Sequence, residues 1–357
     1  MGSDKLKLSV HLPQDPLRNP NRTTRVVSTL FMLTINRRRP VSSFARILHA
    51  LLGAAAVGLA AATFLSFFAS AHWILDLLTH MRLHLAVAAG GLLGLSILAR
   101  AKIGVVLASA ALIGCGVDLV PNPDIENPTS VDEGRPSIKL LMANVLTGNP
   151  DRRSLGRLIQ VEDPDVIGLL EVDAVWVEDL RYLRGRYPYH LADPRSDNFG
   201  IAIYSKMPLE DVRLEDLGGT GLNAITTHID LEDAKVELVI AHPVPPAGRS
   251  YSRIRNSQLK ELAALRSASG AQDFILAGDL NTTPWSPHFR GLLKKTGLRR
   301  ATAGLGADAT WPTALSAPIR IPIDHTLVSS GLAILDYRIG PEIGSDHLPI
   351  IARLGLR

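Results

Sequence analysis

The sequence contains a single cysteine, Cys115, among 357 residues. One cysteine cannot form an intrachain disulfide, and it excludes a metal site built from several thiolates. Aromatic residues are also scarce, at 5% of the chain, although hydrophobic residues make up 46%. With a mean hydropathy of +0.15, this composition is unusual for a protein fully surrounded by water. It indicates that one part of the chain lies in a non-aqueous environment.

A strong excess of charge of either sign is missing as well. The net charge is +4, which is too small to distinguish a polyanionic partner from an anionic lipid surface. Much of the basic charge lies near the N-terminus, in "RTTR" and "NRRRP". Residues 1–46 are polar, contain several prolines and show no helical or strand periodicity. We therefore expect them to form a disordered cytoplasmic tail.

Long apolar runs occur between residues 47 and 119. The first, residues 47–71, continues for about 25 residues without a charge, which at about 1.5 Å per residue is enough to span a bilayer. Two shorter runs cover residues 83–99 and 103–119. Their Gly- and Ala-rich faces favour close helix packing in lipid. We expect three transmembrane helices; the alternative for the shorter runs is buried helices of a soluble domain.

The distribution of basic residues predicts the orientation of these helices. Basic side chains precede the first run and separate the second from the third: Arg37, Arg38, Arg39, Arg46, Arg100 and Lys102. The positive-inside rule places both groups in the cytoplasm. We therefore expect a multi-pass protein of the cytoplasmic membrane, with a cytoplasmic N-terminus and everything after Val120 outside. In an alternative interpretation "LIGC", Leu112–Cys115, is a lipoprotein cleavage site, which leaves the following domain in the same compartment.

The chain after residue 119 changes character twice. Residues 120–137 contain four prolines and little apolar material, so we expect a linker. From residue 138 to the C-terminus, short β-type runs alternate with helical stretches. Several neighbouring strands have no helix between them, which predicts a mixed sheet or two packed sheets. Strands are expected at 138–144, 166–171, 200–205, 223–231, 236–242, 274–278, 323–329 and 348–354, and helices at 153–162, 175–183 and 252–269.

Polar residues with chemical capability lie at the ends of these apolar strands. The set comprises Asn144, Glu171, His242, Asp279, Asn281, Asp324 with His325, and Asp346 with His347. Side chains at strand ends converge on one rim of a sheet, where a rigid scaffold can hold a polar site. Taken singly, each residue has an ordinary interpretation as a turn or cap; the Asp-x-Asn of "GDLN" is a common Asx turn.

Oxygen ligands without thiolates suit a hard cation such as Mg²⁺ or Mn²⁺, which commonly meets substrate phosphates. Histidines beside carboxylates can transfer protons or stabilise charge on a phosphoryl oxygen. The set as a whole therefore predicts metal-assisted hydrolysis of a phosphate ester by water.

The order of these motifs resembles the endonuclease/exonuclease/phosphatase superfamily. Asn144, Glu171 and His242 are followed by "GDLN", "IDH" and "SDH", each attached to a β-type run. The resemblance extends from about Ile138 to the C-terminus. It implies an α/β fold, a four-layer αββα sandwich with two mixed β-sheets, and divalent-metal-dependent phosphoester hydrolysis.

The resemblance also implies a metal site. Glu171 is expected to be the principal ligand, and Asn144 and Asp346 are expected to complete or support the site. The pattern does not decide between one metal ion and two. It is also compatible with a second ion bound by Asp279.

The remaining residues are expected to act on the substrate. By resemblance, Asp279 orients and deprotonates the attacking water, and Asn281 holds a phosphate oxygen. His347, paired with Asp324, acts on the scissile phosphate as base or as charge stabiliser. His242 assists the leaving oxygen or stabilises the pentavalent phosphorus.

Some positions depart from the family pattern or refine it. Many members have Trp where this chain has Ala143, and Gln where it has Leu170; neither change removes a ligand. "AHPVPP", residues 241–246, resembles a membrane-anchored bacterial branch, some members of which carry vancomycin-resistance-type names. Asn198 and Trp311 lie on loops before strands, at positions that often line the substrate pocket in the family. Their alternative roles are a turn residue and a core anchor.

The substrate is the least determined property, because one scaffold hydrolyses many phosphoesters. A domain tethered beside a bilayer meets lipid-linked phosphates at high effective concentration. We therefore expect a phosphoesterase for a membrane-associated or envelope phosphate compound, with membrane lipids as its surroundings. One alternative is an extracytoplasmic nuclease with nucleic acid as its substrate. Another is a membrane protein that keeps the sandwich as a non-catalytic binding module.

Overall fold

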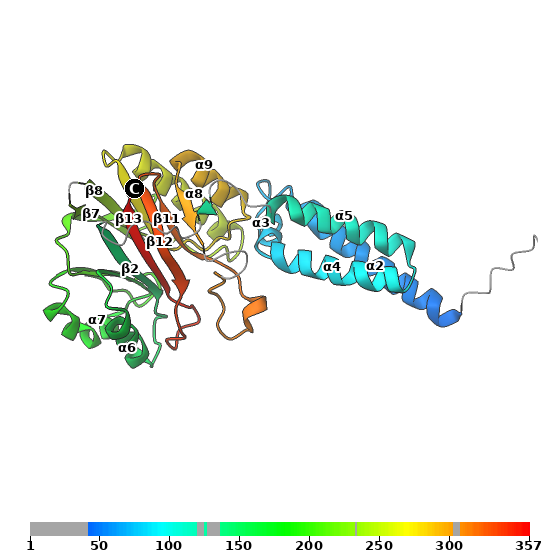
Figure 1. Cartoon of the computed structure of the whole chain (residues 1–357), viewed down its shortest axis with the longest axis horizontal. Coiled ribbons are helices and arrows are strands. Elements are labelled where there is room, and N and C mark those ends of the chain that lie inside the picture. Colours follow the sequence, from blue (N-terminus) through cyan, green and yellow to red (C-terminus); the bar gives the residue numbers. More distant parts are fainter. Residues whose placement is uncertain (1–41, 120–124, 127–135, 233, 303–307) are drawn as a thin grey trace, which may run out of the picture. The chain divides into compact units, whose positions relative to one another are not determined.

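The computed structural model describes residues 42–119, 125–126, 136–232, 234–302 and 308–357 (Figure 1). The chain divides into two compact units, residues 1–48 and 49–357. Most of the predicted disordered tail, residues 1–46, is outside the described residues. Its last four residues, 43–46, are helical, so the first helix begins earlier than predicted.

Four helices make up the apolar N-terminal segment: α2 (Ser43–Ser66), α3 (Trp73–His80), α4 (Arg82–Leu98) and α5 (Lys102–Leu119). By length and composition, α2 and α5 can each cross a membrane. The pair α3 and α4 meets the same criterion only together, and the two are bent by 65° at their break. The segment therefore offers two spans, or three if the bent pair counts as one, where the sequence predicted three.

Small residues bring these helices into close contact. Ala56, Ala89 and Ala108 are completely buried. A Cβ atom added to Gly104 of α5 would lie only 2.4 Å from the Ser96 hydroxyl of α4, so the two helices approach where glycine leaves room. This is the packing that the Gly- and Ala-rich faces predicted.

Cys115, the residue of the alternative lipoprotein interpretation, lies inside the N-terminal helices. Cys115 is fully buried inside the continuous helix α5. Its sulfur lies 3.7 Å from the Thr63 hydroxyl of α2.

The described strands after α5 form two mixed β-sheets. The six-stranded sheet has the order β12-β13-β2-β3-β5-β4, and the seven-stranded sheet has the order β1-β10-β11-β9-β8-β7-β6. The pairs β2–β3, β8–β9 and β1–β10 are parallel, and the other pairs are antiparallel. The strands are β1 (Ile125–Glu126), β2 (Ser137–Asn144), β3 (Val166–Leu170), β4 (Tyr189–Asp193), β5 (Ile201–Ser205), β6 (Glu210–Asp216), β7 (Asn223–Leu231), β8 (Ala234–Ile240), β9 (Asp273–Asp279), β10 (Arg299–Ala301), β11 (Asp324–Val328), β12 (Leu332–Ile339) and β13 (Ile350–Leu356).

Helices cover the outer faces of both sheets. In Figure 1, α6 and α7 lie on one side of the sandwich and α8 and α9 on the other. Three apolar clusters separate the layers: one between the sheets, one under α6 and α7, and one under α8 and α9. The predicted four-layer αββα sandwich is therefore confirmed. The helices are α6 (Arg152–Glu162), α7 (Ala174–Asp179), α8 (Arg249–Ala268) and α9 (Pro287–Thr296), with short 3₁₀ turns η1 (Arg181–Gly185) and η2 (Ala317–Ile319).

Local sequence explains where these helices begin. The Asp151 side chain accepts a hydrogen bond from the Ser154 amide at 3.1 Å and caps α6. Ser286 caps α9 by accepting from the His288 amide at 3.2 Å. Such caps satisfy amides that lack partners in the first turn.

The predicted linker, residues 120–137, is mostly outside the described residues. Ile125 and Glu126 pair with β10 as a short parallel strand, and Ser137 already belongs to β2. These three residues therefore belong to the sheets and not to a linker.

Candidate active site

Strand ends from both sheets meet at one place. Asn144 ends β2 and Glu171 follows β3 in the six-stranded sheet. In the seven-stranded sheet, Asp279 ends β9 and Asp324 begins β11, and these two residues are paired in the register of the strands. All four are at most 8% exposed. The sequence predicted this convergence.

The Asp279 carboxylate is the centre of the cluster. Its Oδ2 lies 3.4 Å from His242 Nε2 and 3.7 Å from His347 Nε2. The same oxygen accepts a hydrogen bond from Asn144 Nδ2 at 3.4 Å, which joins the two sheets. Its Oδ1 accepts a hydrogen bond from the backbone N–H of Asn281 at 2.9 Å. Asp279 is 1% exposed, so these contacts replace water almost completely.

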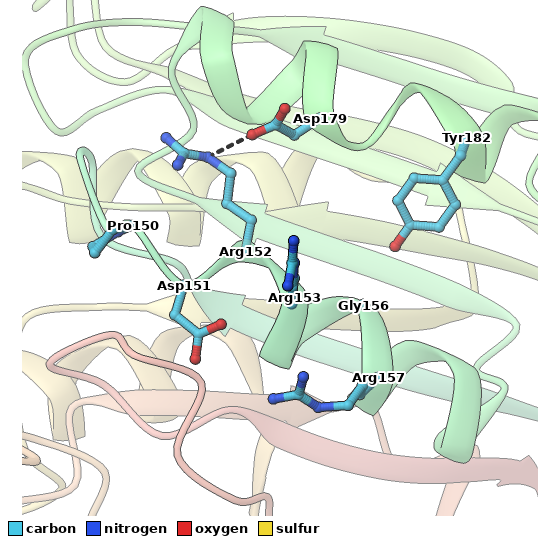
Figure 2. A pocket seen from close by; sticks show the side chains of 8 residues that line it. All are labelled: Pro150, Asp151, Arg152, Arg153, Gly156, Arg157, Asp179 and Tyr182. Atoms are coloured by element: carbon cyan, nitrogen blue, oxygen red, sulfur yellow. Dashed lines mark ion pairs between the residues drawn. The ribbon is translucent and has the colours of Figure 1, made fainter.

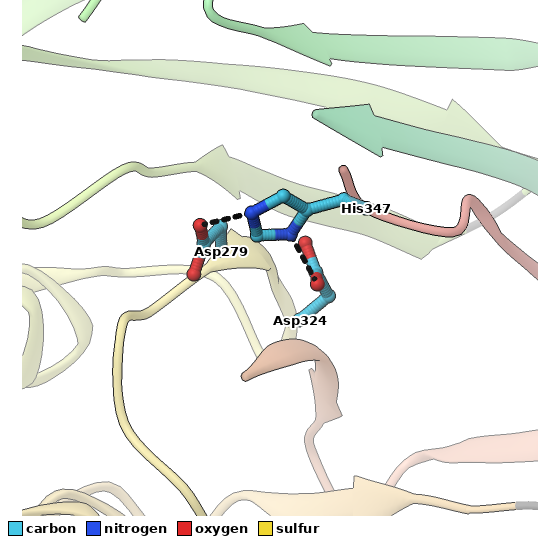
Figure 3. A group of neighbouring side chains, drawn as sticks. All are labelled: Asp279, Asp324 and His347. Atoms are coloured by element: carbon cyan, nitrogen blue, oxygen red, sulfur yellow. Dashed lines mark hydrogen bonds and ion pairs between the residues drawn. The ribbon is translucent and has the colours of Figure 1, made fainter. Parts of the chain in front are cut away.

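His347 lies between two carboxylates (Figure 3). Its Nδ1 is 2.9 Å from Asp324 Oδ2, and its Nε2 faces Asp279. Thr310 Oγ1 donates to the same Asp324 oxygen at 2.6 Å. The loop that carries His347 is fixed by Ser345, whose hydroxyl donates to the Asn144 carbonyl at 2.7 Å and accepts from the His347 amide at 3.1 Å.

The electrostatics of this group follow from burial and mutual charge. Burial alone would lower the pKa of His347, but the Asp324 and Asp279 carboxylates raise it to about 10. Burial would raise the pKa of Asp279, but the charge on His347 and the hydrogen bond from His242 hold it below its ordinary value. Burial, followed by the neighbouring Asp279 charge, raises the pKa of Asp324. His347 is therefore an imidazolium held between acidic groups, suited to stabilising negative charge on a substrate.

Two of the predicted metal ligands, Glu171 and Asp346, offer carboxylate oxygens near this cluster, whereas the side-chain oxygen of Asn144 accepts a hydrogen bond from the backbone amide of Leu146 at 3.1 Å. Glu171 Oε1 accepts from Asn144 Nδ2 at 2.8 Å, and its Oε2 accepts from the Thr147 amide at 3.4 Å. Asp346 Oδ2 accepts from Trp311 Nε1 at 3.0 Å. Its Oδ1 is buried and has no hydrogen-bond partner among the described residues. Carboxylate oxygens, one of them without a hydrogen-bond partner among the described residues, are the ligand type that a hard divalent cation prefers.

A second group also has metal-ligand spacing. Ligand-type atoms of Asp279, Asp324 and His347 lie within 4.8 Å of one another. The chain therefore offers two places for a divalent cation: the carboxylate of Glu171, as the sequence predicted, and this group.

The two predicted pocket residues lie in different surroundings. The Trp311 ring is 6.3 Å from the His347 ring between centroids, and its indole nitrogen contacts Asp346. Asn198 is exposed and has a backbone φ of +67°. The next residue, Phe199, has its ring 5.4 Å from the His242 ring. Trp311 is thus part of the cluster, whereas Asn198 reaches it only through its neighbour.

The sequence analysis missed two residues that contact the Asp279 cluster, and it included one residue whose side chain lies on the opposite side of its strand. Thr310 and Phe199 contact Asp324 and His242, and both are adjacent in sequence to residues that the motifs did select. His325 of "IDH" does not join the cluster. Successive side chains of a strand point to opposite faces. His325 Nε2 therefore lies 2.8 Å from the Thr282 carbonyl, on the other side of β11.

A separate cavity of about 950 Å³ lies at the start of α6 (Figure 2). Arg152 is already engaged there, because its Nε is 2.9 Å from Asp179 and its guanidinium lies over the Trp176 ring. None of the residues that line this cavity belongs to the Asp279 cluster. The lining residues are Pro150, Asp151, Arg152, Arg153, Gly156, Arg157, Asp179 and Tyr182.

A buried Asp-His-Asp group at the rim of two mixed sheets, with further carboxylates nearby, supplies the side chains that metal-assisted hydrolysis of a phosphoester uses. The sequence profile of the Endonuclease/Exonuclease/phosphatase family matches residues 143–347, more than half of the chain. The chain therefore belongs to this family, whose enzymes use divalent metals, and the predicted enzyme class is confirmed. A search of curated proteins finds no match.

Solved structures share the fold. The chain is similar to D. rerio TDP2 complexed with single strand DNA product, with 18% identity, a TM-score of 0.51, and coverage of 61% of this chain and 99% of that chain. It is similar to the human Nocturnin catalytic domain with bound sulfate anion, with 18% identity, a TM-score of 0.50, and coverage of 62% and 96%. It is also similar to the endonuclease/exonuclease/phosphatase from Bacteroides vulgatus, with 19% identity, a TM-score of 0.50, and coverage of 62% and 99%.

Proposed function

We propose that this chain is a membrane-anchored phosphoesterase that uses Mg²⁺ or Mn²⁺ and an activated water to hydrolyse an envelope or lipid-linked phosphate compound. It belongs, in this proposal, to the membrane-anchored bacterial branch that "AHPVPP" resembles. The observation that carries the chemistry is the buried group in which His347 lies between Asp324 and Asp279. The chain that holds this group also contains two helices apolar enough to cross a membrane.

Each residue of the cluster has a defined task in the proposed reaction. The Asp279 carboxylate orients the attacking water and accepts its proton as the new P–O bond forms. The His347 imidazolium, oriented by Asp324, opposes the negative charge that develops on the phosphoryl oxygens. His242 protonates the leaving oxygen as the ester bond breaks.

The phosphate is held by neutral and metal-binding groups. Asn281 Nδ2 donates one hydrogen to the Pro243 carbonyl at 2.9 Å, and its second hydrogen is available to a phosphate oxygen. Glu171, Asn144 and Asp346 would hold the divalent cation. When bound, that cation supplies Lewis-acid stabilisation of the phosphoryl charge.

The surface of the N-terminal helices supports a membrane location. Large apolar side chains are exposed there, among them Val87 at 69%, Leu98 at 82% and Ile113 at 70%. A surface of this kind is expected to face lipid. The arginines before α2 and the pair Arg100 and Lys102 support a cytoplasmic N-terminus and an extracytoplasmic catalytic domain. In that location the enzyme meets lipid-linked phosphates at high effective concentration.

A substrate panel on the detergent-solubilised full chain tests this proposal. We expect Mg²⁺-dependent phosphate release from lipid phosphates or pyrophosphates, and a rate lower by about a hundredfold or more for His347→Ala. Cleavage of plasmid DNA without hydrolysis of lipid phosphates would instead support the alternative of an extracytoplasmic nuclease. D. rerio TDP2, which shares the fold, has been solved in complex with a single-strand DNA product. If no phosphoester is hydrolysed in a metal-dependent manner, the proposal is wrong. The non-catalytic binding module is then the remaining interpretation.

The orientation has a separate test. An alkaline phosphatase fusion after Leu119 is expected to be active, because that enzyme folds only outside the cytoplasm. An inactive fusion at this position, with an active fusion before α2, would reverse the proposed topology.

A further inference from the structure

Asp76 is an acidic residue within the apolar N-terminal segment. It lies on the short helix α3, and it is 1% exposed. A buried carboxylate is costly unless it is paired and hydrogen-bonded. Ionisable residues within such segments are rare and commonly functional, so the partners of Asp76 are informative.

The partners of Asp76 belong to the catalytic domain. Asp76 Oδ2 forms an ion pair with Arg255 of α8, which is completely buried. Asp76 Oδ1 accepts a hydrogen bond from the Ser286 hydroxyl at 2.7 Å. Ser286 is the residue that caps α9, at the end of the loop that follows β9. The carboxylate therefore contacts both Arg255 and the active-site loop.

Arg255 continues the connection to the cluster. Its Nη1 donates to the Asn281 carbonyl at 2.8 Å, and its Nε donates to Asn256 Oδ1 at 2.7 Å. Asn281 in turn donates its amide to Asp279 Oδ1 at 2.9 Å. An unbroken series of contacts thus runs from Asp76 through Arg255 and Asn281 to the residue proposed to orient the water.

The conformation of Asn281 makes this support relevant. Its φ is +49°, in the left-handed region, which side-chain-bearing residues adopt only when their surroundings hold them. Three bonds hold Asn281: the carbonyl to Arg255, the amide to Asp279 and the side chain to Pro243. Loss of the bond from Arg255 would free the peptide that aims both Asn281 and Asp279.

We propose that Asp76 is a positioning residue for the active site: through Arg255 and Ser286 it fixes the loop that carries Asn281. This rests on the proposed function, because Asn281 and Asp279 are assigned their tasks there. Full activity then depends on the apolar N-terminal segment for geometry as well as for anchoring. Glu171 follows β3 in the other sheet, so metal binding by Glu171 is not expected to depend on Asp76.

Kinetics of the full chain in detergent, with bis(p-nitrophenyl) phosphate as the probe, test this proposal. Asp76→Asn and Arg255→Lys are expected to lower kcat/KM by about tenfold to a hundredfold, since small misplacements of catalytic groups have effects of this size. The Mg²⁺ concentration for half-maximal activity is expected to stay within about twofold of wild type. Because a loss of folded protein lowers the apparent kcat without changing this concentration, kcat is calculated for the folded fraction measured by thermal melting.

Arg290→Gln is the matched control. Arg290 Nη1 lies 2.5 Å from Asp118 Oδ1 of α5, so this pair also joins the N-terminal helices to the catalytic domain, but Arg290 is 44% exposed. The variant is expected to keep kcat and KM within about twofold of wild type. If it loses as much activity as Asp76→Asn, general docking of the segments explains the effect and the positioning role is wrong.

Two results separate failure of this inference from failure of the proposed function. An inactive wild-type chain contradicts the function itself. An active wild type with inactive His347→Ala, but with Asp76→Asn and Arg255→Lys both near wild type, contradicts only the positioning role. If thermal melting shows that Asp76→Asn is unfolded, the kcat/KM of Arg255→Lys alone tests the positioning role. Arg255→Lys keeps the positive charge opposite Asp76.

Discussion

The N-terminal helices and the sandwich distribute apolar side chains in opposite ways. In the sandwich, large aliphatic residues such as Leu141, Ile167 and Leu169 are completely buried. In the helices, small residues such as Ala56 and Ala108 are buried, and large apolar residues are exposed. Water drives the first arrangement, whereas lipid is as apolar as leucine and rewards close packing instead. This difference is the one expected if the helices lie in a membrane, as proposed, and the sandwich lies in water.

Buried polar groups also differ between the regions. In the helices, Arg82 Nη2 lies 2.6 Å from Asp118 Oδ2, so two charges of this segment are paired with each other. In the sandwich, the buried Asp279, Asp324 and His347 are gathered at one rim. His347 lies between the two acids, 2.9 Å from Asp324 Oδ2 and 3.7 Å from Asp279 Oδ2. In the helices the paired charges join α4 and α5, whereas the group in the sandwich is the one to which the proposed chemistry is assigned.

The largest predicted effect tests the chemical role of the rim. Asp279→Asn keeps the shape of the side chain but removes the proton acceptor, so kcat is expected to fall by about 10²- to 10⁴-fold. Asp273→Asn is the control, because Asp273 lies at the opposite end of β9, is 5% exposed and accepts from the Ser329 hydroxyl at 2.9 Å. Its kcat is expected within about twofold of wild type. Similar kcat values for Asp279→Asn and Asp273→Asn would mean that Asp279 has no catalytic role beyond that of an ordinary buried carboxylate.

The second prediction compares an exposed apolar residue of the N-terminal helices with an exposed apolar residue of the sandwich. Ile113 on α5 is 70% exposed and Val161 on α6 is 80% exposed. A lysine in place of Ile113 is expected to cost about 2.5–3.5 kcal/mol of membrane insertion, whereas Val161→Lys is expected to change stability by less than about 0.5 kcal/mol. The share of the full chain that resists carbonate extraction measures the difference. If wild type and both variants resist carbonate extraction to the same extent, Ile113 does not face lipid.

The third prediction sharpens the account of helix packing. Gly104→Val places side-chain atoms where a Cβ would already lie 2.4 Å from Ser96 Oγ, and we expect a loss of about 1–3 kcal/mol in unfolding free energy. Gly94→Val is the matched control, since no atom lies within 4 Å of an added Cβ there. Thermal melting of the detergent-solubilised chain distinguishes them. Equal melting temperatures would show that α4 and α5 do not depend on close approach.

The smallest predicted effect concerns the aqueous surface of the sandwich. Arg186 and Lys206 lower the pKa of Asp163 from 3.8 to about 2. A lowered folded-state pKa gives stability that is present above pH 3.8 and is lost as the pH falls through about 2. Asp163→Asn, which tolerates the left-handed φ of +47° at this position, is expected to lower Tm at pH 7 by only ~1–2 °C.

The pH dependence provides the check on that interpretation. The difference in Tm between wild type and Asp163→Asn is expected to shrink as the pH is lowered from 3.8 toward 2. A difference that stays constant over this range would assign the effect to packing instead of charge.

The fold was predictable where strands are apolar on both faces. The predicted limits of β3, β5 and β9 agree with the structure within two residues, because every residue of these strands is buried. The strand β6, with the sequence "EDVRLED", was missed because it is a mostly exposed edge strand without an apolar pattern. The helix α9 was also missed; its start at Pro287 follows a proline-containing turn that suggested only a loop.

The candidate site was predictable as a set but not as a geometry. Strand-end position identified Asn144, Glu171, Asp279 and Asp324, because adjacent strand ends must lie close together. It could not identify the contact between Asp76 and Arg255, which lie 179 residues apart in the sequence. Pairing over such a separation depends on how finished elements pack, which no local pattern encodes.

Metal-dependent hydrolysis by the full chain is the central claim, and one assay addresses it most directly. Phosphate-diester hydrolysis is measured for wild type and His347→Ala, with Mg²⁺ and after addition of EDTA. We predict turnover by wild type only with Mg²⁺, and a rate lower by about a hundredfold or more for His347→Ala. Equal turnover by both proteins, or turnover that EDTA leaves unchanged, would contradict the account.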